Sequence, residues 1–248
     1  MSEELNLIIE GRNAVIEALK SDRSIDKILI QKGNQEGSIN SVIKEAKKRK
    51  IVTTFVEKEK LDSVSEGTKH QGVIAYAAAY NYATIEDVLL KAQEQEEDPF
   101  IIILDSIMDP HNLGAIIRTA NIAGAHGIVI PKRRAVGLTA TVAKTSAGAI
   151  NYTPIVKVTN LSRTIEELKE KGLWFVCGDM DGDSMYDIDL KGAIGLVVGS
   201  EGEGVSKNVK EKCDFVASIP MSGEINSLNA SVATGVLAFE VVRQRLRK

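Results

Sequence analysis

Three stretches of this 248-residue sequence combine polar side chains and glycines in a way that suits a binding or reacting site. The first runs from Asp105 to Ala120. Within it, Asp109 and Pro110 are typical of a helix start, as a capping side chain and a first-turn proline. Arg118 lies among apolar residues, which predicts a buried guanidinium that needs an acidic partner or an anionic substrate. Gly114, on the same helix face, should leave room for that ligand.

The second stretch is a glycine-rich loop, Gly199 to Gly204, that follows an apolar strand. Loops of this kind often bind nucleotides. The spacing fits neither G-x-G-x-x-G nor a P-loop, and Glu201 and Glu203 would repel a pyrophosphate. We therefore expect an uncharged or cationic nucleoside compound as the ligand, rather than a di- or triphosphate.

The third stretch, Ile219 to Ser231, joins a short strand to the last helix. It contains a proline, a glycine, two asparagines and three serines. Polar side chains at a helix start either cap the helix or bind a ligand. Ser227 and Asn229 flank Leu228 there, and one cap is sufficient. We therefore expect the other polar side chain to face a ligand.

An alternation of strands and helices positions these stretches, each at the carboxyl end of a strand. The apolar strands favour a mostly parallel sheet that helices cover on both faces. The last helix is apolar on nearly all sides, so a second copy of the chain is expected to cover it. The other expected segments are an acidic loop at Asp179–Asp189, a helix at Val205–Lys212, and a last helix from near Ser227 to near Arg247.

The chain is predicted to have two domains, separated by an acidic stretch that ends in proline. Residues 1–80 form a small α/β domain, residues 81–98 a linker with six acidic residues and one lysine, and residues 99–248 the larger domain. His70 is interpreted as a turn residue without a catalytic role. The net charge of −3 implies that any RNA or DNA is bound by a local patch.

Cys177 and Cys213 have no CxxC partner, and we interpret both as buried thiols in a reducing compartment. No metal site is expected. The first residues have no apolar signal core, and no apolar run approaches the roughly 20 residues of a membrane span. The sequence thus predicts a cytoplasmic protein that does not contact a membrane.

Together, the three stretches resemble the SpoU-type branch of the SPOUT RNA methyltransferases, over residues 100–245. The shared motifs are N-x-G-x-x-x-R-T-A, L-V-V-G-S-E-G-x-G and I-P-M-x-G-x-x-x-S-L-N-A-S-V-A. The first 80 residues, with E-G-R-N-A-V and H-Q-G-V, are similar to a ribosomal-protein-like RNA-binding domain. That domain occurs in family members that methylate a guanosine ribose in large-subunit ribosomal RNA. The resemblance implies a trefoil knot, a rare exception among folds, with the chain after Ile219 threaded through a loop.

The resemblance also implies S-adenosylmethionine as cofactor and a homodimer with its site at the interface. The implied catalytic residues are Arg118, Asn112, Glu201, Ser227 and Asn229, and the implied cofactor positions are Gly199, Gly204, Ile219, Met221 and Leu228. Candidate RNA contacts are Arg12, Lys132, Arg133, Arg134 and Lys144. A free guanidinium has a pKa above about 12. Arg118 could therefore be an altered general base, or it could orient the hydroxyl and stabilise developing charge.

The sequence therefore predicts 2′-O-methylation of ribosomal RNA, with a guanosine of the large subunit as the target. A 2′-hydroxyl target requires RNA rather than DNA. One alternative is methylation of transfer RNA, which the N-terminal domain disfavours. Another is a catalytically inactive RNA-binding or ribosome-assembly factor, which the intact motif residues disfavour. The methylated nucleotide stays open, as does the choice between free RNA and an assembling particle.

Overall fold

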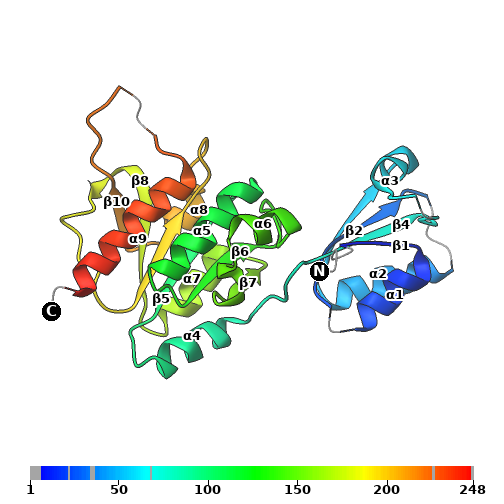
Figure 1. The fold of residues 1–248 in the computed structure, drawn as a ribbon, viewed down its shortest axis with the longest axis horizontal. Coiled ribbons are helices and arrows are strands. Elements are labelled where there is room, and N and C mark those ends of the chain that lie inside the picture. Colours follow the sequence, from blue (N-terminus) through cyan, green and yellow to red (C-terminus); the bar gives the residue numbers. More distant parts are fainter. Residues whose placement is uncertain (1–6, 22, 34–36, 68, 225–226, 247–248) are drawn as a thin grey trace. The chain divides into compact units, whose positions relative to one another are not determined.

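The computed structural model describes residues 7–21, 23–33, 37–67, 69–224 and 227–246. The chain folds into two units (Figure 1). One unit contains residues 1–81 and 137–140, and the other contains residues 82–136 and 141–248. None of the helices in the described ranges combines the length and the apolar character that a membrane span requires.

The first unit is a four-stranded sheet in the order β1-β4-β2-β3, with helices on both faces. Its elements are β1 (Ile8–Glu10), α1 (Arg12–Lys20), β2 (Ile25–Gln31), α2 (Ser38–Lys48), β3 (Val52–Val56), α3 (Lys58–Val64) and β4 (Val73–Ala77). Val15 of α1 and Val42 of α2 pack in one apolar core, and Leu61 of α3 packs in a smaller core. His70 lies in the turn before β4, where its Nδ1 accepts a hydrogen bond from the Gly72 amide.

The second unit is a six-stranded parallel sheet in the order β10-β8-β9-β5-β6-β7. The strands are β5 (Phe100–Leu104), β6 (Gly127–Pro131), β7 (Ile155–Val158), β8 (Trp174–Ser184), β9 (Ile194–Val198) and β10 (Phe215–Ser218). The helices are α4 (Ile85–Glu94), α5 (Pro110–Ile122), α6 (Ala140–Thr145), the 3₁₀ turn η1 (Ala149–Asn151), α7 (Leu161–Lys169), α8 (Lys207–Lys210) and α9 (Ala230–Leu246).

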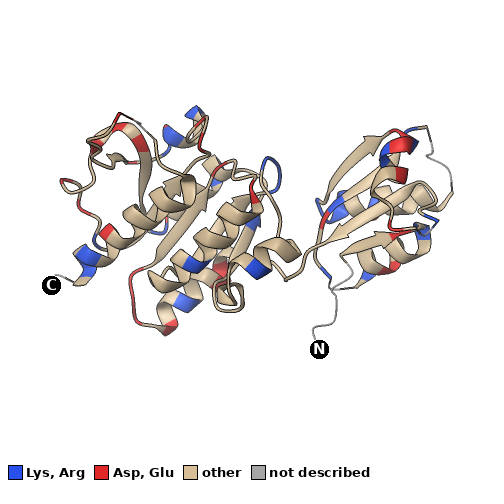
Figure 2. Ribbon diagram, turned by 45° about the horizontal axis from the view of Figure 1, so that its top comes forward, with Lys and Arg blue, Asp and Glu red and all other residues tan. Residues whose placement is uncertain are grey.

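Helices cover both faces of this sheet, as the continuous apolar strands predict. Helices α4, α7 and α8 pack on one face and share a core with β5, β8 and β9. Helices α5 and α9 pack against each other, with α9 against β9 and α5 against β6. Every residue of β5 and β9 is buried, and Figure 2 has no charged residue on either strand. The predicted mostly parallel α/β fold is confirmed.

Strand β8 differs from the prediction, which placed an acidic loop at Asp179–Asp189. The strand continues to Ser184 because Asp183 and Ser184 pair with β10. Between the two paired parts the register shifts, so residues 178–182 are not matched to β10. Acidic side chains suggested a loop, but parallel main-chain pairing on both sides of the irregularity keeps this segment in the sheet.

Two helices are shorter than predicted. Helix α8 ends at Lys210, because the amides of Lys212 and Cys213 bond to carbonyls three residues back and tighten the end of the helix. Helix α9 begins at Ala230, so Ser227 lies before the helix rather than in it. The predicted threading after Ile219 passes through residues 225 and 226, which lie outside the described residues.

The acidic stretch that we interpreted as a linker contains helix α4. Thr84 and Asp87 form a capping box at its start. Val88 and Ala92 are buried, and Val88 belongs to the core of the second unit. Three of the six acidic residues of this stretch are exposed on the helix and the other three follow it, while the apolar stripe of the helix packs on the sheet.

Candidate functional site

The glycine-rich loop after β9 is a tight turn. Ser200 and Gly204 exchange two backbone hydrogen bonds of 3.2 and 3.0 Å, from amide to carbonyl oxygen. A Cβ on Gly199 would lie 2.0 Å from the carbonyl carbon of Gly204, so only glycine fits there. Gly204 has a φ of 65°, a conformation that glycine adopts without strain. The two glycines therefore fix a turn that presents Glu201 at its tip.

Asp105 anchors the far end of this loop. Its side chain is buried directly after β5, where Oδ2 accepts a hydrogen bond of 2.9 Å from the Ser206 amide. Its Oδ1 accepts one of 3.1 Å from the hydroxyl of Ser106. Asp105 therefore links the carboxyl end of β5 to the start of α8, where the loop after β9 ends.

Three polar side chains from separate stretches meet at the loop tip. Asn112 Nδ2 donates to Glu201 Oε1 at 2.8 Å. Asn229 Nδ2 donates to Asn112 Oδ1 at 3.0 Å and also to Glu201 Oε1. The Asn229 Oδ1 accepts a hydrogen bond of 2.9 Å from the Ser231 amide at the start of α9. We call Asn112, Glu201 and Asn229 the polar triad.

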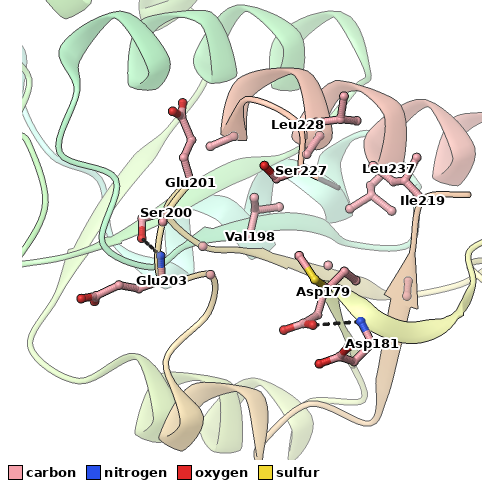
Figure 3. Close-up of a pocket in the computed structure, with 18 of the residues that line it drawn as sticks. Asp179, Asp181, Val198, Ser200, Glu201, Glu203, Ile219, Ser227, Leu228 and Leu237 are labelled. Carbon is pink, nitrogen blue, oxygen red and sulfur yellow. Dashed lines mark hydrogen bonds between the residues drawn. The ribbon is translucent and has the colours of Figure 1, made fainter. Parts of the chain in front are cut away.

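A first cavity of about 280 Å³ lies beside the triad, between the carboxyl ends of β8, β9 and β10 (Figure 3). Its lining comprises Gly178, Asp179, Met180, Asp181, Val198, Gly199, Ser200, Glu201, Gly202, Glu203, Gly204, Ala217, Ile219, Met221, Ser227, Leu228, Ala230, Ala233 and Leu237. Four of these residues are acidic, and no lysine or arginine is among the described residues of the lining. The cavity therefore suits an uncharged or cationic ligand.

Asp179 is held in its charged state at the edge of the first cavity. Lys210 Nζ contacts its Oδ2 at 2.9 Å, and the Asp181 amide donates to its Oδ1 at 3.1 Å. Burial alone would raise the pKa of Asp179, but these contacts outweigh burial and lower the pKa below its ordinary value. A fixed negative charge therefore faces this side of the cavity.

A second cavity of about 650 Å³ lies on the other side of Glu201. Its lining comprises Ser106, Ile107, Met108, Asp109, Asn112, Arg134, Ser200, Glu201, Glu203 and Ala230. Four residues line both cavities: Ser200, Glu201, Glu203 and Ala230. Two ligands could therefore approach each other across the polar triad.

Comparison with known proteins identifies the family. Residues 99–239 match the SpoU rRNA Methylase family, which is more than half of the chain. The chain belongs to the SpoU rRNA methylase family. Residues 8–83 match a second description, RNA 2′-O ribose methyltransferase substrate binding. This SpoU methylase is 51% identical over 246 residues to a Bacillus subtilis (strain 168) protein assigned to the TrmH family of tRNA/rRNA methyltransferases. That match covers 99% of this chain and 98% of the relative.

Solved SpoU structures have the same fold. The SpoU methyltransferase AviRb from Streptomyces viridochromogenes, in complex with AdoMet, is 22% identical with a TM-score of 0.62. The alignment covers 97% of this chain and 91% of AviRb. The A. aeolicus TrmH/SpoU tRNA modifying enzyme is 29% identical with a TM-score of 0.55, over 61% of this chain and 77% of that one.

The SpoU methylase structure brings together most of the predicted site residues. The predicted cofactor positions Gly199, Gly204, Ile219, Met221 and Leu228 all line the first cavity. Of the predicted catalytic residues, Asn112, Glu201 and Asn229 form the polar triad, and Ser227 lines the first cavity. Segments that are 28 to 117 residues apart in the sequence thus form one site.

Arg118 lies elsewhere, and two predictions about it were wrong. Its side chain is exposed on α5 and outside the described lining of both cavities. Gly114 is buried, and a Cβ there would lie 2.6 Å from Thr145 Cβ, so the missing side chain accommodates α6 rather than a ligand. Apolar neighbours in the sequence suggested a buried arginine, but Ile116, Ile117 and Ala120 are on the buried side of α5, and Arg118 is on its exposed side.

The predicted RNA contacts are distributed over both units. Arg134 lines the second cavity. Lys132 and Arg133 belong to the loop after β6, and Lys144 is exposed in the last turn of α6. Arg12 begins α1 in the first unit, where its Nε donates to the Gln71 carbonyl at 3.1 Å. Their contact with RNA stays a prediction.

Sequence reasoning missed Asp105, Asp179 and Asp181 as site residues of this SpoU methylase. Asp105 anchors the loop, and the other two line the first cavity. A sequence signal was present, because Asp105 directly follows a buried strand and Asp179 follows the apolar part of another. In a parallel sheet, the carboxyl ends of neighbouring strands form the ligand site.

Proposed function

We propose that this SpoU methylase transfers a methyl group from S-adenosylmethionine to the ribose 2′-hydroxyl of a guanosine in large-subunit ribosomal RNA. The observation that supports this most is the pair of cavities that share Glu201, with the polar triad between them. A methyl transfer needs two ligands held in line, one on each side of the reacting centre. Alignment of this kind contributes up to about 7–11 kcal/mol to catalysis.

The first cavity fits S-adenosylmethionine. This cofactor is a nucleoside with a cationic sulfonium, and the cavity has four acidic lining residues. Three residues of the lining are assigned to the adenine edge, which their backbone amides and carbonyls would bind: Gly199, Ile219 and Leu228. The bound cofactor supplies an electrophilic methyl group. Asp179, which Lys210 holds in its charged state, is one of the acidic groups that would face the sulfonium cation.

The polar triad acts on the ribose. The target hydroxyl is a weak nucleophile, so the enzyme has to orient it and accept its proton. Asn112 holds the Glu201 carboxylate at 2.8 Å, which keeps this acceptor fixed beside the second cavity. Arg118 orients the phosphate next to the target ribose and stabilises the charge that develops on its oxygen.

A homodimer completes this site. Val232, Phe239 and Leu246 follow each other at seven-residue intervals on α9, and they are 50%, 47% and 79% exposed. Ile122 at the end of α5 is 64% exposed and lies one turn after Arg118. An apolar stripe of this kind favours a second copy of the chain as cover. A copy that covers α9 and Ile122 also approaches Arg118.

The first unit supports ribosomal RNA as the substrate. Residues 8–83 match a description of RNA 2′-O ribose methyltransferase substrate binding. The A. aeolicus tRNA modifying enzyme aligns with only 61% of this chain. A domain added to the catalytic unit favours a large structured RNA over transfer RNA. We also propose a cytoplasmic location, where ribosomal RNA is available.

Methyl transfer to separated RNA pools tests the proposal. Purified protein is incubated with methyl-labelled S-adenosylmethionine and with ribosomal or transfer RNA from cells that lack the enzyme. We expect label in large-subunit ribosomal RNA. Label in transfer RNA alone would support the transfer RNA alternative, and no label in any RNA, free or in ribosomal particles, would support the inactive RNA-binding factor.

A further inference from the structure

Charge is segregated within the second unit. Residues 110–165 contain seven Lys or Arg and no Asp or Glu, in a chain whose net charge is −3. Residues 166–248 contain ten Lys or Arg and fourteen Asp or Glu. In Figure 2, red segments gather around β8 and the loop that follows it. The elements from α5 to β7 therefore form a basic half of this unit.

The sheet brings part of this basic half together at one edge. β6 and β7 are the last two strands in the sheet order, and they run parallel. In their register, Ile130 is opposite Lys157, and the Lys132 amide donates to the Val158 carbonyl at 2.7 Å. Lys157 therefore lies beside the start of the basic loop Lys132–Arg134, although 25 residues separate it from Lys132.

Lys157 is held in place by an aromatic ring. Its Nζ lies 4.8 Å from the ring centroid of Tyr82 and 3.4 Å from the Tyr82 hydroxyl oxygen. The backbone positions this pair, because the Ala83 amide donates to the Ile155 carbonyl at 2.8 Å. The face of an aromatic ring attracts a cation, and a lysine ammonium has three donors for oxygen acceptors. Lys157 thus presents a pre-oriented positive charge.

The other end of the basic loop reaches the second cavity, which Arg134 lines. Four basic residues therefore form a row that leads from the sheet edge to the polar triad: Lys157, Lys132, Arg133 and Arg134. Arg163, further along the chain, is paired with Glu167 at 2.8 Å and is not part of the row. RNA has one phosphate per nucleotide, and a row of cations follows a strand backbone without reading its sequence.

We propose that Lys157, seated on Tyr82, extends the Lys132–Arg134 loop into one phosphate-binding edge that guides the RNA strand into the second cavity. This inference rests on the proposed function, because it assumes that RNA enters that cavity. It adds a residue that no sequence motif indicated. The partner is the RNA backbone, so the contact is electrostatic and independent of base sequence.

Salt-dependent RNA binding tests this edge. Affinity of the full chain for a fluorescein-labelled RNA hairpin is measured by anisotropy, between about 50 and 200 mM salt. Lys157→Met keeps the apolar stem and removes the charge. Each lost phosphate contact should reduce the slope of log affinity against log salt by about 0.7 to 0.9. Lys157→Arg should keep the wild-type slope.

Lys207→Met is the matched control. Lys207 is an exposed lysine on α8, in the acidic half of the unit, and its removal should leave the slope unchanged. S-adenosylmethionine binding by each variant, measured by calorimetry, reports on correct folding. A wild-type slope for folded Lys157→Met would overturn the proposal, and so would an equal decrease for Lys207→Met. Failure of the wild type to methylate any RNA would instead refute the proposed function, whatever the slopes.

Discussion

At the scale of single residues, Asn229 explains why the last strand-to-helix connection is so rich in polar side chains. Its amide oxygen accepts hydrogen bonds from Ser231 and so caps α9. Its amide nitrogen donates to Asn112 and Glu201. The sequence suggested that one polar residue caps the helix while another faces the ligand. Asn229 is the capping residue and also joins the polar triad, which fixes the start of α9 relative to the triad, whereas Ser227 lines the first cavity.

Replacing Arg118 tests whether an exposed arginine takes part in the reaction. Arg118→Ala should bind S-adenosylmethionine with unchanged affinity, because the side chain lies outside the first cavity. Methyl transfer should fall by about 100-fold or more, as is typical when a group that stabilises developing charge is removed. Calorimetry and single-turnover methyl transfer measure the two effects. Near-wild-type transfer by Arg118→Ala would remove this residue from the mechanism.

His126 provides a pH-dependent contribution to stability. It is fully buried, and its Nδ1 accepts a hydrogen bond of 2.9 Å from the Phe100 amide, which requires the neutral ring. Burial lowers the pKa of His126 below the ordinary value of 6.5, and nearby Lys91 and Arg245 act in the same direction. The carboxylate of Glu97, 3.4 Å from Nε2, opposes this shift without cancelling it.

The sign of the pH effect follows from this lowered pKa. Below pH 6.5 the unfolded chain binds a proton at His126 before the folded chain does, so the free energy of unfolding falls as the pH decreases. At pH 7 and above, the contribution is complete. Urea unfolding of wild type and His126→Asn, which keeps an acceptor near the Phe100 amide, should show a weaker pH dependence in the variant. Identical pH profiles above pH 5 would contradict this assignment.

At the scale of elements, the glycine-rich loop should not tolerate a side chain at Gly199. A Cβ there would lie 2.0 Å from the Gly204 carbonyl carbon, so the turn would have to open. We expect Gly199→Ala to lower the free energy of unfolding by about 1–3 kcal/mol and to weaken cofactor binding. Gly202→Ala, in the same loop but with no atom within 4 Å of the added Cβ, should leave the melting temperature unchanged. Equal stability of the two variants would argue against this packing.

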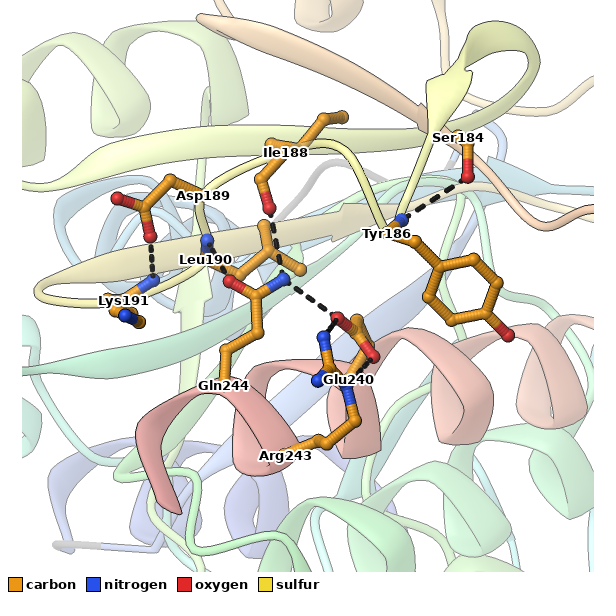
Figure 4. A network of polar contacts seen from close by, with 9 residues as sticks. All are labelled: Ser184, Tyr186, Ile188, Asp189, Leu190, Lys191, Glu240, Arg243 and Gln244. Atoms are coloured by element: carbon orange, nitrogen blue, oxygen red, sulfur yellow. Dashed lines mark hydrogen bonds and ion pairs between the residues drawn. The ribbon is translucent and has the colours of Figure 1, made fainter. Parts of the chain in front are cut away.

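Gln244 ties α9 to the loop between β8 and β9 (Figure 4). Its Oε1 accepts a hydrogen bond of 2.8 Å from the Leu190 amide, and its Nε2 donates to the Ile188 carbonyl at 3.0 Å. The same Nε2 donates to Glu240 at 2.7 Å, and Glu240 is also paired with Arg243. The buried Glu240 carboxylate thus accepts from two neighbouring donors, Arg243 and Gln244, about one turn further along α9.

Gln244→Ala should lower the free energy of unfolding by about 1–3 kcal/mol, because it leaves buried polar groups of the loop without partners. Gln93→Ala, at an exposed position on α4, is the control and should have little effect. Chemical denaturation measures both values. A loss no larger in Gln244→Ala than in Gln93→Ala would mean that water replaces the side chain in this network.

The sequence was sufficient for some elements and not for others. The uninterrupted runs of apolar residues predicted β5 and β9, because a strand that is buried on both faces is apolar at every position. The end of β8 was not predicted, since Asp183 and Ser184 pair through main-chain atoms that the side-chain pattern does not report. The exposure of Arg118 depends on which side of α5 faces the sheet, and that orientation comes from tertiary packing. The motifs identified the residues of the polar triad. Only the structure shows that Asp105 anchors the glycine-rich loop and that Lys210 holds Asp179.

At the scale of the whole molecule, the exposed stripe on α9 predicts a homodimer. Phe239→Glu should shift the mass measured by sedimentation to that of a monomer, because a charge would be buried in the interface. Trp174→Glu changes an aromatic residue that is 56% exposed elsewhere on the unit and should not alter the mass. A monomeric wild type would refute the dimer, and so would a Phe239→Glu variant that keeps the dimer mass.

The chemical position of the transferred methyl group tests the proposed 2′-O-methylation most directly. Ribosomal RNA is methylated by the wild type, digested to nucleosides and analysed by mass spectrometry, alongside RNA treated with Glu201→Ala. We expect 2′-O-methylguanosine with the wild type and a loss of it with the variant, since Glu201 lines both cavities. A methyl group on a base, or an undiminished yield with Glu201→Ala, would contradict the proposed function.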